Sequence, residues 1–229
     1  MPDYLFTPQP QASLAIQGSS KRFAVHRIYC VGRNFSEHAK EMGAVVEKGN
    51  PVFFMKPADA VIQAAEVPYP SETRDLHHEV EMVLALGQTI SEPMTLDNAL
   101  QSIYAYAVGL DLTRRDLQAL AKEKRLPWDT SKGFDASAPI SVLVPASETT
   151  ISPDTRLQLH VNGKLRQSAV LGDMIYSCAE VLVALSKLFA LKTGDLIFMG
   201  TPAGVAALEP GDTYIAELEG VVSLSGRIV

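Results

Sequence analysis

The sequence predicts an α+β fold that is rich in strands. Its 15 Gly and 14 Pro residues are spread along 229 residues as frequent short turns, a distribution that favours many strands over long helices. Only one segment has the apolar spacing of a long helix. Three apolar segments near the C-terminus are separated by turns that contain Gly, which indicates a strand-rich C-terminal half.

The N-terminal half is predicted to form strands at four apolar or alternating segments, residues 23–31, 51–56, 79–87 and 103–112. The last of these also fits a short helix. The run Val-Phe-Phe-Met at 52–55 is expected to be buried. Between the first two strands, Asn34 or Ser36 is suited to cap a brief helix over residues 34–42.

The long helix is predicted to begin at Asp173, which is a good N-cap residue, and to end at Thr193-Gly194. Between these limits apolar or small residues recur at steps of three and four: Ile175, Cys178, Ala179, Leu182, Leu185, Ser186 and Phe189. Residues 195–199, 213–218 and 221–228 follow as predicted strands. Residues 113–124 also have helical character, with Lys122, Glu123 and Lys124 expected to be solvated charges.

The composition argues against several classes of function. A net charge of −6 and a pI near 5.4 do not suit a protein that binds nucleic acid. The distant Cys30 and Cys178 form no CxxC pair, so a disulfide framework or thiolate zinc site is not expected. No signal-peptide pattern and no apolar run of about 20 residues is present. We therefore expect a soluble cytoplasmic protein that binds neither nucleic acid nor membrane.

A cluster of acidic residues is the strongest chemical signal. Side chains alternate along a strand, so Glu79 and Glu81 are expected to face the same side. Asp111 ends another apolar run, where burial is expected. Neighbouring buried carboxylates need a cation or a shared proton; a metal is the simpler explanation, and an all-oxygen set suits Mg²⁺, or Mn²⁺ or Ca²⁺. Two alternatives stay open: the glutamates line a solvated strand face, or His77 joins them in a mixed site.

Several segments together resemble the fumarylacetoacetate hydrolase family, specifically its short acylpyruvate hydrolase branch. They are Val31-Gly32-Arg33-Asn34-Phe35 with His38 and Glu41, Phe54-Met55-Lys56-Pro57, His77-His78-Glu79-Val80-Glu81, Gly109-Leu110-Asp111-Leu112-Thr113 with Arg115, Asp116 and Gln118, Leu126-Pro127-Trp128 with Lys132, Val161-Asn162-Gly163, and residues 200–205. The resemblance implies a mixed β-sandwich roll assembled as a homodimer. It also implies one catalytic domain, residues 23–229, after a leader of residues 1–22.

The resemblance also implies roles for individual residues. They are metal ligation by Glu79, Glu81 and Asp111, catalysis by His38, Glu41 and Lys132, and binding of the oxoacid end of the substrate by Arg115, Gln118 and Thr201. Phe35 stands where many members of the family have Tyr, which we interpret as a neutral packing change.

The implied reaction is hydrolysis of the carbon-carbon bond of a small acylpyruvate. His38 and Glu41 lie three residues apart, so one helical turn would place them on one face, where Glu41 can orient the imidazole that takes a proton from water. Fumarylpyruvate, from aromatic-ring breakdown, is the expected substrate. Arg33 is the candidate for its distal carboxylate, with a structural ion pair as the alternative.

Two other functions remain open from the sequence. The same metal and oxoacid groups could decarboxylate or tautomerise oxaloacetate, which requires no attacking water. A non-catalytic module that binds a metal and an oxoacid is the alternative from a different class.

Overall fold

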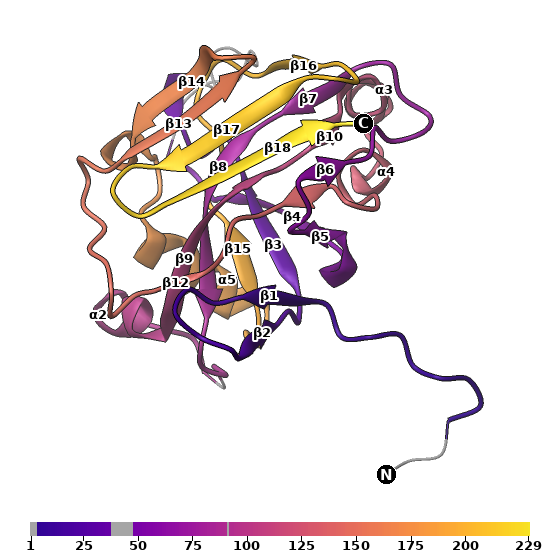
Figure 1. Ribbon diagram of the computed structural model, residues 1–229. Helices are drawn as coiled ribbons and strands as arrows, with labels where there is room; N and C mark the ends of the chain where they lie inside the picture. The colour runs from indigo at the N-terminus through magenta and orange to yellow at the C-terminus, as the bar shows by residue number, and fades with distance from the viewer. Residues whose placement is uncertain (1–3, 38–47, 91) are drawn as a thin grey trace.

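The computed structural model describes residues 4–37, 48–90 and 92–229, which form two main sheets packed face to face (Figure 1). No helix within these residues is long and apolar enough to cross a membrane. The larger sheet has six strands in the order β12 (Val144–Pro145), β9 (Ile103–Leu110), β8 (Val80–Leu86), β15 (Leu196–Phe198), β3 (Ile28–Gly32) and β4 (Val52–Lys56). Only β15 and β3 are parallel in it, so the sheet is mixed.

The second sheet has five strands in the order β14 (Lys164–Val170), β13 (Arg156–Val161), β17 (Thr213–Leu218), β18 (Val222–Ile228) and β6 (Glu66–Val67). Every second residue of β13 and β17 is buried, as expected for a sheet with one solvated face. These side chains pack against β8 and β9 of the larger sheet, behind β17 and β18 in Figure 1. The predicted α+β sandwich roll, rich in strands, is confirmed.

Three smaller sheets complete the fold: β10 (Thr113–Arg114), β7 (Leu76–His78) and β16 (Ala206–Leu208); β1 (Ser13–Ala15) and β2 (Arg22–Ala24); and β11 (Ala138–Pro139) and β5 (Val61–Ile62). Strand β1 lies within the predicted leader, residues 1–22. Its Leu14 is fully buried in a second apolar cluster behind the large sheet.

The helices are short: η1 (Ala58–Ala60), α2 (Leu96–Ala99), η2 (Leu100–Ser102), α3 (Arg115–Lys124), α4 (Asp129–Lys132), η3 (Leu171–Asp173) and α5 (Cys178–Leu188). The predicted start of the long helix at Asp173 is wrong, because Asp173 belongs to η3. Ser177 caps α5 instead, in a capping box whose second member is Glu180. The helix ends at Leu188, before Thr193-Gly194.

Three other local predictions need correction. Residues 23–31 divide into β2 and β3, because the backbone of His26 bonds to Gly194 between them. The run at 52–55 is not buried: Val52 is 42% and Met55 40% exposed, because β4 is the edge strand of its sheet. Asn34 caps no helix among the described residues, because its side-chain oxygen accepts from Tyr176 N while its amide donates to the carbonyls of Tyr176 and Met199.

Candidate metal and oxoacid site

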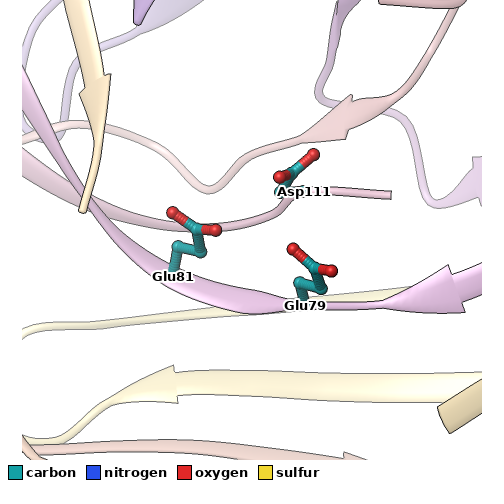
Figure 2. A group of neighbouring side chains, drawn as sticks. All are labelled: Glu79, Glu81 and Asp111. Atoms are coloured by element: carbon teal, nitrogen blue, oxygen red, sulfur yellow. The ribbon is translucent and has the colours of Figure 1, made fainter. Parts of the chain in front are cut away.

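Three carboxylates meet at the start of β8 and the end of β9. Glu79 lies in the break between β7 and β8, and Asp111 follows the last residue of β9. The register that pairs Glu81 with Gly109 continues through a hydrogen bond of 2.8 Å from Asp111 N to Glu79 O. This register brings carboxylate atoms of Glu79, Glu81 and Asp111 within 4.8 Å of one another, as Figure 2 shows. All three side chains are buried.

Three cationic side chains surround the carboxylates. Lys132 Nζ lies 2.8 Å from Glu79 Oε2 and 2.5 Å from Asp111 Oδ2. Arg115 donates to Glu79 Oε1 at 2.5 Å, and Lys56 Nζ lies 2.8 Å from Asp111 Oδ1. Burial opposes the charge on Lys132, but Asp111 and Glu79 outweigh burial and raise its pKa.

Lys56 was not among the predicted site residues, although it lies in one of the matching segments. Lys56 is the last residue of β4 and is 2% exposed, so it is a buried ion-pair partner of Asp111. It also donates to the backbone carbonyls of Leu112 and Lys132. It thereby joins the loops that carry Asp111 and Lys132.

Two of the carboxylates are still incompletely satisfied. Among the described residues Glu81 forms no salt bridge; it accepts a backbone hydrogen bond from Gly200 N at 2.6 Å, and burial together with Asp111 and Glu79 raises its pKa well above the usual value. Asp111 Oδ1 has no hydrogen-bond partner among the described residues, because the nearby Lys56 ammonium lacks suitable geometry. A divalent cation would satisfy both groups. The all-oxygen donor set fits Mg²⁺ or Mn²⁺.

His77 is not part of this carboxylate cluster. One ring nitrogen lies 2.9 Å from Asp75 Oδ1, and the other accepts from Arg115 Nε at 3.3 Å. Burial and the charge of Arg115 lower its pKa. His77 therefore orients Arg115 by accepting a hydrogen bond from the guanidinium, which in turn contacts Glu79.

One face of α3 borders a pocket above the carboxylates. Arg115, Gln118 and Lys122 lie on this face at positions i, i+3 and i+7, and all three line the pocket. Arg115 donates to Gln118 Oε1 at 2.6 Å. Lys122 was predicted to be a solvated charge, and that prediction is wrong, because its side chain is half-buried over the Trp128 ring, 5.4 Å from the centroid.

The turn at Gly200-Thr201-Pro202 contributes Thr201 to the lining of the same pocket. Gly200 has a φ of 92°, which an L side chain rarely adopts, and its N–H points at Glu81. Gln167 donates to Thr201 Oγ1 and to Pro202 O, both at 2.8 Å, while its own oxygen accepts from Val80 N and from His78 Nδ1. Gln167 lies on β14, and no motif or periodicity in the sequence marks it.

Residues 27–229 match the protein-family profile described as Fumarylacetoacetate (FAA) hydrolase C-terminal. The chain belongs to this family. As a member of the fumarylacetoacetate hydrolase family it is 44% identical to a fumarylpyruvate hydrolase from Pseudomonas aeruginosa, solved in complex with Mn²⁺ and pyruvate; the match covers 99% of both chains with a TM-score of 0.96.

Curated relatives in the fumarylacetoacetate hydrolase family carry another activity in their names. An oxaloacetate tautomerase of Escherichia coli K12 is 39% identical over 93% of this chain and 97% of its own length. A mitochondrial oxaloacetate tautomerase of Rattus norvegicus is 40% identical over 88% of this chain and 90% of its own.

Two of the residues that the family resemblance nominates, His38 and Glu41, lie outside the described residues. Arg33 is described: it follows β3, lines the pocket and has a φ of 61°, which is uncommon for a residue with a side chain. Phe35 is buried and bridges to Met174, so it packs within the fold.

Proposed function

We propose that this chain is a divalent-metal-dependent hydrolase that cleaves a short acylpyruvate, such as fumarylpyruvate, to pyruvate and a carboxylic acid. The observation that carries the proposal is the pocket in which three buried carboxylates meet Arg115, Gln118, Lys132 and Thr201. The pocket thus combines ligands for a hard cation with donors for an oxoacid. The 44% identity over nearly the whole chain to a fumarylpyruvate hydrolase supports hydrolysis as its reaction.

A divalent cation bound by Glu79, Glu81 and Asp111 would supply Lewis-acid charge to the vicinal oxygens of the pyruvoyl group. The Arg115 guanidinium, already oriented by Glu79 and His77, offers a planar fork for the carboxylate of that group. Gln118 and Thr201 are neutral hydrogen-bonding groups that line the pocket. The Lys132 ammonium adds positive charge where an enolate oxygen would develop.

The proposed roles of His38 and Glu41 rest on the sequence. His38 would take a proton from water as its oxygen attacks the acyl carbonyl, with Glu41 holding the imidazole. The bond between the acyl carbon and the pyruvate methylene then breaks, the acyl group leaves as a carboxylic acid, and the pyruvate enolate takes up a proton. A tautomerase or decarboxylase does not require a pair of residues, such as His38 and Glu41, that activates water.

Tautomerisation of oxaloacetate is the second candidate, favoured by the names of the relatives that are 39% and 40% identical. The same pocket would bind the oxoacid, and only a proton would be moved between carbon and oxygen. Decarboxylation of oxaloacetate uses the same groups. A module that binds a metal and an oxoacid without turnover is the remaining alternative.

The test compares substrates on one preparation. We expect Mg²⁺- or Mn²⁺-loaded protein to release pyruvate and fumarate in equal amounts from fumarylpyruvate, with a higher kcat/KM than for oxaloacetate, and to lose this activity when the metal is chelated. Turnover of oxaloacetate alone would reject hydrolysis in favour of the second candidate. Binding of oxalate with no turnover of either compound would favour the non-catalytic module.

We also propose that the protein acts in the cytoplasm as a homodimer, with Mg²⁺ as its working ion, in the breakdown of aromatic compounds. Light scattering of the purified protein tests the dimer, and a monomeric mass would reject it.

A further inference from the structure

Two cations that line the pocket, Arg33 and Lys122, have no role in the proposed chemistry. Lys122 lies two turns beyond Arg115 on the same face of α3, about 10 Å along the helix axis at 1.5 Å per residue. Because their backbone positions are two turns apart, the two long side chains can reach the pocket from different places and contact opposite ends of one extended dicarboxylic acid.

Two aromatic rings contribute apolar surface to the same pocket. Trp128 and Phe54 both line the pocket, with their rings 5.8 Å apart between centroids. The Lys122 ammonium lies over the Trp128 ring, which restrains the long side chain at the pocket instead of leaving it in solvent. The carbon chain of an acyl group can pack against these rings.

The charge around Lys122 is also unbalanced. Among the described residues no carboxylate forms a salt bridge with Lys122 or Arg33, whereas Lys132 contacts two. Burial, then the charges of Arg115 and Arg33, lower the pKa of Lys122. Lys122 therefore offers the pocket a positive charge that is not paired in a salt bridge with a carboxylate of the described residues.

We propose that Lys122 binds a second carboxylate, at the far end of the acyl group, and so selects acylpyruvates that are dicarboxylic acids. The inference rests on the proposed function and names the substrate class of that same site. It assigns to Lys122 the distal contact for which the sequence nominated Arg33.

The experiment removes the charge and keeps the length. Lys122→Met should lower kcat/KM for fumarylpyruvate by about 10- to 100-fold, the effect of losing one charge-assisted hydrogen bond, and change kcat/KM for acetylpyruvate less than about 2-fold. Lys122→Arg should restore most of the activity. Lys124→Met, on the exposed side of α3, is the matched control and should change neither substrate. Equal losses on both substrates, or a selective loss in Arg33→Ala but not in Lys122→Met, would overturn the proposal.

A binding measurement separates this proposal from the proposed function. If native protein cleaves no acylpyruvate, hydrolysis is rejected, and calorimetry on the Mn²⁺-loaded protein then decides the role of Lys122. The probes are 2-oxoheptanedioate and 2-oxoheptanoate, which differ in the distal carboxylate alone. We expect native protein to prefer the dicarboxylate by at least about 10-fold and Lys122→Met to lose that preference. Equal affinity of native protein for both probes would refute the proposal.

Discussion

Acid should destabilise this protein through a buried histidine behind the Gly200-Thr201-Pro202 turn. His78 is 1% exposed and donates from Nδ1 to Gln167 Oε1, and burial lowers its pKa from 6.5 to about 4. As the pH falls below 6.5 the unfolded chain therefore binds a proton at this histidine, whereas the folded protein does not until the pH approaches 4. The stabilisation is complete above pH 6.5 and is lost as the pH falls toward 4, to a total of about 3 kcal/mol.

The change that isolates this effect is His78→Asn, which keeps a side-chain N–H for Gln167 and removes the titrating ring. We expect the free energy of unfolding of native protein to fall by about 2 kcal/mol more than that of the variant between pH 7 and pH 4.5. Urea unfolding of metal-free protein at the two pH values measures the difference. His160→Asn, on the solvated face of β13, is the control and should behave as native protein does. Parallel losses in native protein and His78→Asn would refute the reasoning.

Three further predictions concern the metal ligands, the turn and the proposed base. Glu81→Gln should weaken Mn²⁺ binding by about 100-fold or more, because replacing even a residue that only hydrogen-bonds to a metal ligand commonly lowers metal affinity by 10- to 100-fold. Unchanged affinity in a metal titration would remove Glu81 from the ligand set. Gly200→Ala should cost about 2 kcal/mol, because φ is 92° and a Cβ would lie 2.7 Å from that of Asn34; an unfolding midpoint like that of native protein would contradict this. His38→Ala should abolish hydrolysis while metal and oxalate affinity stay nearly intact, and an equal loss of oxalate binding would indicate a structural histidine.

Periodicity predicted part of what positions the acidic residues. The alternation at Glu79 and Glu81 predicted the strand observed as β8, and the glutamates do face one side, whereas the apolar run ending at Asp111 fitted a strand or a short helix and forms β9. The pairing register of those strands, which a single strand's pattern does not contain, then brings Asp111 beside Glu79.

Other features were within reach of local reasoning. Ser177 and Glu180 form a capping box that marks the true start of α5, a stronger signal than Asp173 alone. The spacing of Arg115, Gln118 and Lys122 places them on one helix face, so Lys122 could have been separated from its exposed neighbours.

The remaining features depend on contacts between distant segments. Gln167 reaches the site only because β14 passes beside the Thr201 turn, more than thirty residues away in sequence. The exposure of Val52 follows from the edge position of β4, which depends on how six strands are ordered. Neither fact is encoded in the residues next to the one concerned.

The most direct test of the account follows the oxygen of the attacking water. Metal-loaded protein is incubated with fumarylpyruvate in heavy-oxygen water, and the released fumarate is examined by mass spectrometry. Hydrolysis predicts fumarate with heavy oxygen in its newly formed carboxylate, released in step with pyruvate and absent from His38→Ala. The account would be contradicted if fumarylpyruvate stayed intact while the protein rapidly interconverted the keto and enol forms of oxaloacetate.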